Sequence, residues 1–382
     1  MSAALVQDAL FEDVVVVPAT EGVKYAGSKL KLLPYIIDLV RSTDARVILD
    51  GFSGTTRVSQ ALSQLGYQMI ANDSAVWSKV FGTCYLLNKQ QPSHYQALID
   101  HLNALPPKFG WFSEHYGGSP ENESAGRSDG LKKPWQLHNT MKLDAIREEI
   151  DALDLDEIEK SVALTSLILA LDAVDSTIGH YASYLRRWSP RSYRQMKLSV
   201  PHLVPQKENH FVYQKDIFDL LSDVKVDLAY FDPPYGSNNE KMPPSRVRYS
   251  AYYHLWTTII LNDHPTLFGK AKRRQDSSDK LAASVFEEFR KNPETGRFIA
   301  VEAIEKMLMA VNARYVLLSY SSGGRATAME LQEALHRAGR LLDVVKVDYR
   351  QNVMAGMKWT NEWTRDHGSA PHQEFLYLIE KY

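Results

Sequence analysis

Short apolar runs alternate with amphipathic helical patterns along most of the chain. Runs of aliphatic, aromatic or β-branched residues predict strands at 46–50, 68–73, 211–214, 226–231, 315–320, 341–349 and 375–379. Helical patterns follow the first two runs, to about Leu65 and about Asn88, and Gly66 is placed to end the first helix. Alternating strands and helices indicate an α/β fold with a mostly parallel sheet, whose last two runs form a hairpin-like pair closing one edge.

Two stretches break this alternation and are expected to be insertions. Residues 91–205 have a mainly helical pattern, interrupted by a loop rich in Gly, Ser, Pro and Asn at 116–130. Residues 241–299 carry prolines and scattered basic side chains, and we expect this basic insertion to be partly mobile. The sheet domain then consists of 20–90, 206–240 and 300–382.

Composition narrows the class of protein further. The chain has 382 residues, 44% of them hydrophobic and 24% charged, with a net charge of −2, so it is long enough to bury a core without disulfides. Its single cysteine, Cys84, excludes an internal disulfide and a multi-cysteine zinc site. The acidic N-terminal segment does not resemble a signal peptide, and no window reaches the roughly 18 apolar residues of a membrane span. We therefore expect a soluble, cytoplasmic protein.

The first strand and its turn have the pattern of a nucleotide-like binding site. The strand ends at Asp50, and small residues through Thr56 then lead into a helix, as in α/β folds that hold such ligands. The second strand ends in Asn72 and Asp73, and an acid at about this spacing commonly accepts hydrogen bonds from ribose hydroxyls. The dehydrogenase fingerprint G-x-G-x-x-G is absent, and ordinary strand-turn-helix connections would also explain these two elements on their own.

A second motif, Asp232-Pro233-Pro234-Tyr235, follows the strand at 226–231. Two successive prolines fix the backbone and direct the Asp232 carboxylate and the Pro233 carbonyl toward the carboxyl ends of the strands. Together these two acceptors match the two protons of an exocyclic amino group lying against the face of Tyr235. The alternative is a structural Pro-Pro loop with an acid that caps a helix.

These motifs together resemble the Dam-like class of adenine-specific DNA methyltransferases, which use S-adenosylmethionine. That class carries K-[WY]-x-G-[SG]-K, matched here by 24–29, and D-x-F-x-G-x-G, matched by 50–56. A K-D-I-F-like segment at 215–218 and the D-P-P-Y tetrad follow in the family's order. The resemblance implies a seven-stranded methyltransferase (Rossmann-like) sheet and the transfer of a methyl group to N6 of a flipped-out adenine.

The resemblance also assigns roles to residues. It implies that Asp232, Pro233, Pro234 and Tyr235 are catalytic. The residues implied to contact S-adenosylmethionine are Lys24, Tyr25, Gly27, Lys29, Asp50, Phe52, Ser53, Gly54, Asp73, Asp216 and Ile217, and no metal ligand is implied. One position departs from the family pattern, because Thr56 replaces the second glycine of the turn and leaves less room for the backbone to approach a ligand.

Other chemistries fit these residues less well. Cytosine C5 methylation needs a cysteine nucleophile, usually in a Pro-Cys pair, whereas Cys84 lies between Thr83 and Tyr85 in a helical pattern and is expected in the core. Glutamine-amide methylation favours Asn at the position of Asp232. Cytosine-N4 methylation uses the same amine chemistry, often with Ser in place of Asp232, and stays open as an alternative. So does a non-catalytic relic that only binds nucleic acid.

Basic residues concentrate in two segments. Between 181 and 215 there are seven Lys or Arg and one acid, with aromatic rings interleaved, and between 241 and 280 there are eight basic residues and three acids. We expect contact with double-stranded DNA from Arg186, Arg187, Trp188, Arg191, Arg194, Lys241, Arg246, Arg248, Lys272, Arg273 and Arg274. A solvated basic face is the alternative. The resemblance further implies a restriction-modification system with a cognate endonuclease, and we expect a monomer with 91–205 as a possible DNA-recognition region.

Overall fold

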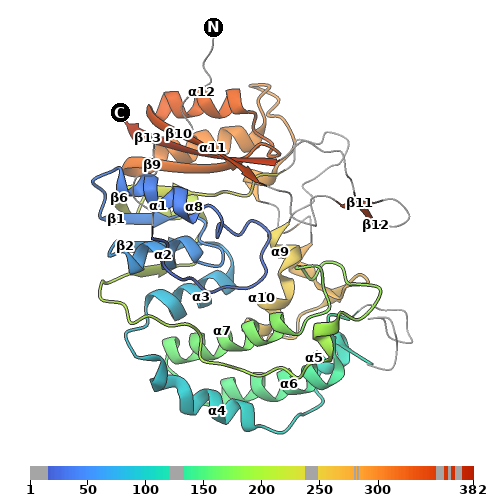
Figure 1. Ribbon diagram of the computed structural model, residues 1–382. Coiled ribbons are helices and arrows are strands. Elements are labelled where there is room, and N and C mark those ends of the chain that lie inside the picture. The colour runs from blue at the N-terminus through green and yellow to red at the C-terminus, as the bar shows by residue number, and fades with distance from the viewer. Residues whose placement is uncertain are drawn as a thin grey trace.

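The structure is a computed structural model and describes residues 16–119, 133–236, 248–278, 281, 284–349, 357–359, 363–365 and 372–382. Its main feature is a seven-stranded sheet with the order β10-β13-β9-β6-β1-β2-β5 (Figure 1). The strands are β1 (Val47–Asp50), β2 (Gln68–Asn72), β5 (Phe211–Tyr213), β6 (Lys225–Phe231), β9 (Asn312–Ser321), β10 (Gly339–Tyr349) and β13 (His372–Lys381). All seven strands predicted from the sequence are present.

The pairing within the sheet confirms the predicted mostly parallel α/β fold. Strand β1 pairs in parallel with β2 and β6, β2 pairs in parallel with β5, and β6 with β9. Strand β13 lies antiparallel between β9 and β10, so the predicted hairpin-like pair closes that edge. Because parallel strands end at the same edge, Asp50, Asn72 and Asp232 are brought to one side of the sheet.

Helices cover both faces of the sheet, and an apolar core lies between each layer and the strands. One core cluster joins the sheet to α1 (Leu33–Arg41) and α2 (Arg57–Gln64). A second joins the other face to α8 (Ile217–Leu221), α11 (Ile299–Ala310) and α12 (Ala328–Ala338). Local sequence fixes several helix ends. For example, Thr327 and Glu330 form a capping box at the start of α12, and Gly66 follows α2 with a φ of 91°.

The remaining helices form a layer at the β5 end of the sheet, away from β10 and β13 (Figure 1). They are α3 (Val76–Leu86), α4 (Gln96–Ala104), α5 (Trp111–Tyr116), α6 (Leu137–Ala152), α7 (Glu157–Ala173), α9 (Tyr249–Tyr252) and α10 (His254–Leu261). Apolar side chains from both predicted insertions share one core cluster with α3, including Cys84, Tyr253 and Trp256. The two insertions therefore pack together against the sheet domain, and the domain boundaries proposed above stay a prediction.

The described residues also form four short 3-10 helices, Pro92–Tyr95, Pro190–Tyr193, Gln275–Ser277 and Val285–Glu287, and three short two-stranded ribbons. They pair β3 (Gly117–Gly118) with β4 (Trp135–Gln136), β7 (Leu267–Phe268) with β8 (Arg273–Arg274), and β11 (Met357–Trp359) with β12 (Trp363–Arg365). Within the described residues, the structure contains no helix with the length and apolar character that crossing a membrane requires.

Candidate active site

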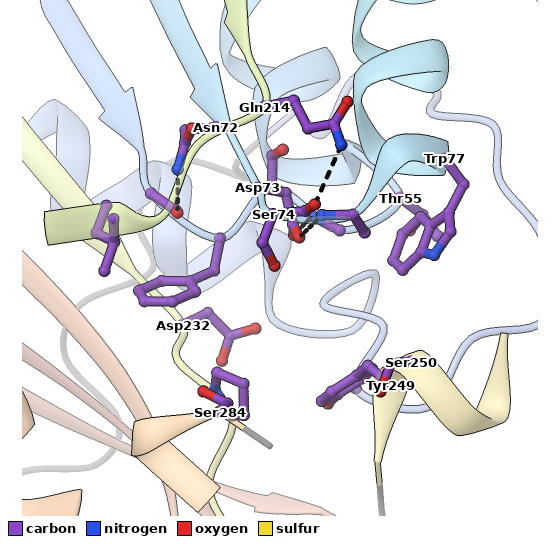
Figure 2. A pocket seen from close by; sticks show the side chains of 18 of the residues that line it. Thr55, Asn72, Asp73, Ser74, Trp77, Gln214, Asp232, Tyr249, Ser250 and Ser284 are labelled. Carbon is purple, nitrogen blue, oxygen red and sulfur yellow. Dashed lines mark hydrogen bonds between the residues drawn. The ribbon is translucent and has the colours of Figure 1, made fainter. Parts of the chain in front are cut away.

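A cavity of about 470 Å³ opens where β1, β2 and β6 end. Its walls come from the turns after these strands, from the segment around Tyr25 to Lys29, and from α9, α10 and the residues between 274 and 287. Figure 2 shows the carboxylates of Asp73 and Asp232 at this cavity, from the ends of β2 and β6 on either side of β1, with Tyr249 and Ser284 across from them. Residues far apart in the sequence thus converge on one cavity.

The turn after β1 presents an incompletely satisfied acid to the cavity. Asp50 is 1% exposed, and its Oδ2 accepts a hydrogen bond of 2.6 Å from the Ser59 hydroxyl. Its Oδ1 has no hydrogen-bond partner among the described residues. The pKa of Asp50 is raised to about 7, chiefly by burial and also by the nearby charges of Asp232 and Asp73, while the hydrogen bond from Ser59 acts to lower it. Such a site favours a ligand that brings a hydrogen-bond donor or a positive charge.

The rest of this turn is held by hydrogen bonds to the segment that follows β2. The Gly54 amide donates to Asp73 Oδ2 at 3.0 Å, the Ala75 amide donates to Asp73 Oδ1 at 3.0 Å, and Ser53 and Ser78 share a hydrogen bond of 3.0 Å. Burial raises the pKa of Asp73, while these amides oppose the shift. Asp73 therefore connects the ends of β1 and β2, and Phe52, Ser53, Gly54 and Asp73 all line the cavity, as predicted.

Thr56, the departure from the family pattern, takes the conformation that a glycine would adopt. Its φ of 61° is left-handed, an unfavourable region for a β-branched residue. The side chain is fully buried, donates to the Thr55 carbonyl at 2.7 Å and accepts from Gln60 Nε2 at 3.1 Å. These contacts hold the strained backbone in place, so the turn keeps its shape although Thr56 replaces the glycine.

The third predicted cofactor segment also lies at the cavity. Asp216 caps α8 by accepting from the Phe218 amide at 2.9 Å, and its side chain is exposed, whereas Ile217 is 4% exposed. Both residues line the cavity. The structure therefore brings Asp216 and Ile217 to the wall formed by the turns after β1 and β2.

The N-terminal segment contributes three of its four predicted residues. Tyr25, Gly27 and Lys29 line the cavity, and Gly27 has a φ of 91° with the Tyr249 hydroxyl 2.7 Å from where a Cβ would stand. Lys24 is not brought to the cavity. Its ammonium instead lies 3.4 Å from Asp172, in the last turn of α7, and 2.8 Å from Asp175, just after this helix. Lys24 therefore ties this segment to the helical layer.

The tetrad after β6 is held by groups from distant parts of the chain. Lys29 is 7% exposed, and its ammonium lies 2.9 Å from Asp232 Oδ2 and 2.8 Å from the Tyr235 hydroxyl. The Tyr235 hydroxyl donates a short hydrogen bond to Asp232 Oδ1. Burial raises the pKa of Asp232, and the positive charge of Lys29 opposes the shift. Asp232 and Pro234 line the cavity, whereas Pro233 and Tyr235 do not, so the structure does not present the Tyr235 ring as a free face.

Sequence reasoning assigned no role to Glu374 or Ser319, which lie on the adjacent strands β13 and β9. Both are 3.3 Å from the Tyr235 hydroxyl, Glu374 through its Oε2 and Ser319 through its Oγ. Burial also raises the pKa of Glu374. Neither residue belongs to a local motif, and only the pairing of β13 beside β9 brings Glu374 to this corner. No signal in the sequence alone would have found it.

The residues predicted to contact DNA have different environments. Arg186, Arg187 and Arg194 are exposed, whereas Arg248 is 8% exposed. Lys241 and Arg246 lie outside the described residues. The two basic segments contact each other, because the Tyr184 hydroxyl donates to the Ala271 carbonyl at 2.9 Å. Lys272 and Arg273, next to Ala271, are half-buried.

The side chains of three other residues in this set bind partners within the protein. Trp188 is 7% exposed and donates its indole N–H to the Ser119 carbonyl at 3.1 Å, so its ring is not placed to stack on bases. Arg191 donates from Nε to the Asp175 carboxylate at 2.8 Å. Arg274 is 3% exposed and lies 2.7 Å from Asp263 and 2.8 Å from Asp276. The charges of these arginines are balanced internally, in contrast to the prediction that they contact DNA.

The residues at the cavity fit S-adenosylmethionine, a cation with a methionine and a nucleoside part. Asp50 Oδ1 is a buried acceptor without a donor, and Asp50, Asp73 and Asp232 gather negative charge whose burial raises all three pKa values. A volume of about 470 Å³ lies in the usual range for a cofactor site. Among the described residues, no group of three or more His, Cys, Asp or Glu side chains is arranged to hold a metal ion.

Comparison with known proteins agrees with this geometry. Residues 25–307 match the family model of the D12 class N6 adenine-specific DNA methyltransferases. The chain is 27% identical to the type II methyltransferase M.NlaIII of Neisseria lactamica, over 94% of this chain and 99% of that protein. It is also 27% identical to modification methylase StsI of Streptococcus sanguinis and 25% identical to M.FokI of Planomicrobium okeanokoites, but it spans only 48% and 52% of their lengths.

Among solved structures, a Thermoplasma acidophilum protein aligns over 92% of this chain with 8% identity and a TM-score of 0.30, a likeness too weak to bear on the fold. The family match spans most of the chain, including the turn after β1 and the tetrad after β6. The chain belongs to the D12 class of N6 adenine-specific DNA methyltransferases.

Proposed function

We propose that this chain transfers a methyl group from S-adenosylmethionine to N6 of an adenine flipped out of duplex DNA. The observation that carries the proposal is the Asp232 carboxylate, which the stiff Pro233-Pro234 corner directs into the same cavity as Asp50 and Asp73 (Figure 2). A base stacked in a duplex does not reach a cavity at the strand ends, so the target adenine leaves the helix to enter it.

The cofactor would be held by the turns after β1 and β2 and by the start of α8. Asp50, Phe52, Ser53 and Gly54 would border its methionine part, Asp73 its ribose, and Asp216 and Ile217 its adenine, with Tyr25, Gly27 and Lys29 closing the remaining wall. Bound S-adenosylmethionine supplies a methyl group that its positively charged sulfur activates for transfer. The protein's task is to hold the amine in line with that carbon.

Asp232 would do this by accepting a hydrogen bond from the N6 amino group. The Pro233 carbonyl would accept a second, which requires the corner to turn, because Pro233 does not line the cavity. An aromatic amine is a weak nucleophile because its lone pair is delocalised into the ring. Two acceptors on its protons favour a pyramidal nitrogen and fix the line of attack, and such positioning contributes about 7 to 11 kcal/mol of barrier lowering. The carboxylate also stabilises the positive charge that develops on N6.

The exposed basic residues give this site a route to DNA. Arg186 and Arg187 lie close in sequence to Tyr184, whose hydroxyl contacts Ala271. The two basic segments therefore adjoin each other, and Arg274, whose charge Asp263 and Asp276 balance, leads from Ala271 to the cavity wall. The exposed arginines, and not Arg274, would make the phosphate contacts that position a flipped base. The relatives named as type II methyltransferases support a restriction-modification role. We further propose a cognate endonuclease as partner and a monomer that acts in the cytoplasm.

The decisive experiment incubates the protein with methyl-labelled S-adenosylmethionine and DNA of mixed sequence, then digests the DNA and identifies the labelled base. We expect label on adenine N6 within one short sequence. Label on cytosine N4 would instead support the related amine chemistry. Calorimetric titration with S-adenosylmethionine provides a second measurement, since a relic that only binds nucleic acid would bind no cofactor.

A further inference from the structure

We propose that Glu374 is a positioning residue that takes the Tyr235 hydroxyl away from Asp232 when the target amine arrives. The inference rests on the proposed function, since it concerns how Asp232 becomes available to adenine. Glu374 lies in β13, beyond residue 307 where the family match ends, and no motif of the sequence includes it.

The starting point is that both oxygens of Asp232 already have partners. Oδ1 accepts the short hydrogen bond from the Tyr235 hydroxyl, and Oδ2 lies 2.9 Å from the Lys29 ammonium. Each carboxylate oxygen can accept more than one hydrogen bond, so an adenine amino group that donates to Asp232 competes with these donors for the charge of the carboxylate and for the space beside it. Before any substrate binds, Tyr235 and Lys29 therefore supply the donors to the Asp232 carboxylate.

The Tyr235 hydroxyl is the donor that can leave at the smaller cost. Lys29 is 7% exposed, and moving its ammonium from Asp232 would leave a buried charge without its carboxylate. A phenolic hydroxyl carries one hydrogen and reorients by rotation about its C–O bond, so it donates to one acceptor at a time. Rotation frees Asp232 Oδ1 without moving the ring.

Glu374 is placed to receive that hydrogen. Its Oε2 is 3.3 Å from the Tyr235 hydroxyl, and the hydroxyl also accepts from the Lys29 ammonium at 2.8 Å, so it stays fixed between them. The ring itself is held by Tyr320, whose centroid is 4.8 Å away and whose hydroxyl donates to the Tyr235 carbonyl at 3.1 Å. A rigid ring between two carboxylates makes the exchange of one hydrogen bond the simplest change that opens Asp232.

Strand pairing explains why Glu374 is in reach. In β13, Glu374 pairs with Ser321 of β9, and Phe375 pairs with Tyr320, so the strand carries the carboxylate to the carboxyl end of the central strands. The exposed fraction of Glu374 is intermediate, and its pKa is raised by burial while Lys29 opposes the shift. The acid therefore lies near enough to Lys29 to share its charge with Asp232.

The test compares Glu374→Met, which removes the acceptor at similar length, with Glu374→Gln, which keeps an acceptor oxygen without the charge. Single-turnover methyl transfer is measured for both, alone and combined with Tyr235→Phe. We expect Glu374→Met to lower the rate about 10-fold or more with unchanged affinity for S-adenosylmethionine, and Glu374→Gln to recover most of the loss. Glu380→Gln at the far end of the same strand is the matched control and should leave the rate unchanged.

The double variant separates this role from a structural one. Without the hydroxyl there is nothing to remove from Asp232, so Glu374→Met should cost no further activity in a Tyr235→Phe background. Independent losses from the two substitutions, or a Glu374→Met rate within threefold of the unmodified protein, would overturn the inference. If Glu374→Met fails to fold, Glu374→Ala serves in the same comparison. An unmodified protein that methylates no adenine would instead refute the proposed function.

Discussion

The two halves of the cavity are built in different ways. On the cofactor side, Asp50 is held by Ser59, nine residues away, and Asp73 accepts from Gly54, nineteen residues away. On the tetrad side, Lys29 contacts Tyr235 from 206 residues away, and Tyr235 contacts Glu374 from 139 residues away. The acids of the first half are held within one local strand-turn-helix structure, although Asp216 and Ile217 join its wall from farther along the chain. The second half exists only when the N-terminal segment, β6 and β13 are assembled.

This difference separates binding from chemistry. In the cofactor half, the buried Asp50 Oδ1 has no donor among the described residues, which suits a cationic ligand. In the tetrad half, each oxygen of Asp232 already has a donor, Lys29 or Tyr235, with which the substrate amine would compete. A substitution in one half should therefore leave the other half's function largely intact, and the predictions below test that independence.

The largest effect is expected for Asp232→Ala. Removing the acceptor of the N6 amino group should lower methyl transfer at least about 10³-fold, because positioning and charge stabilisation are both lost. Affinity for S-adenosylmethionine, measured by calorimetry, should change far less than the transfer rate, because the cavity loses one negative charge while Asp50, whose pKa the charge of Asp232 raises, ionises more readily. The substitution also leaves the buried Lys29 ammonium without its carboxylate, so the melting temperature should fall.

Asp232→Asn is the matched variant, because it keeps an acceptor oxygen while removing the charge. It should retain more activity and bind cofactor as the unmodified protein does. If Asp232→Ala transferred methyl groups within tenfold of the unmodified rate, the amine would have to be held by other groups, and the division between the two halves would be wrong.

An intermediate effect is expected for the pH dependence of cofactor binding. The pKa of Asp50 is raised to about 7 in the folded protein, above the usual value of about 3.9, because the carboxyl group is buried. The folded protein therefore holds a proton that the unfolded chain releases, and the free energy of unfolding falls as pH rises from about 4 to about 7. A cationic ligand prefers the ionised form, so affinity should rise about five- to tenfold between pH 6 and pH 7.5.

Two variants sharpen this prediction. Asp50→Asn should weaken binding and remove its pH dependence, and it should also remove this group's contribution to the fall in stability. Ser59→Ala removes the hydroxyl that lowers the pKa of Asp50, so the midpoint of the binding transition should move to higher pH. Calorimetry across pH provides both measurements. A flat affinity profile in the unmodified protein would mean that Asp50 does not face the cofactor's charge.

The sequence predicted the local half of this molecule better than the assembled half. The spacing of apolar residues located all seven strands of the sheet. The small-residue turn after the first strand, together with the acid that ends the second, indicated that Asp50 and Asp73 lie at a binding site, and both line the cavity. These features arise from residues close in sequence, whose hydrophobic pattern and turn chemistry act locally. The helix that ends at Gly66 and the core position of Cys84 were also predicted from such local patterns.

The sequence did not show which partners lie far away along the chain. That Trp188 and Arg191 contact DNA stays a prediction, and within the protein Trp188 is buried and Arg191 pairs with Asp175. Lys24 likewise is drawn to Asp172 and Asp175. The sequence does not distinguish a basic residue that binds a DNA phosphate from one that pairs with a buried aspartate of another segment. Only the tertiary fold decides which of them it meets.

The smallest effect is expected on the DNA surface, where the exposed arginines Arg186 and Arg187 should matter. Arg186→Ala with Arg187→Ala should weaken binding of duplex DNA while cofactor affinity is unchanged. Each phosphate contact contributes about 0.9 to the slope of log affinity against log salt, so losing two contacts should lower the slope by about 2. Binding is measured by fluorescence anisotropy at several salt concentrations.

The control removes the same number of charges elsewhere. Arg41 and Arg46 are exposed where α1 ends and β1 begins, at the amino end of the strand whose carboxyl end borders the cavity. Arg41→Ala with Arg46→Ala should therefore leave the slope unchanged. Both double variants change the net charge equally, and long-range attraction therefore cannot account for a difference between them. An equal loss in the two would mean that DNA responds to total charge alone. A difference confined to Arg186 and Arg187 would place the phosphate backbone beside the segment that contacts Ala271, on the route to the cavity.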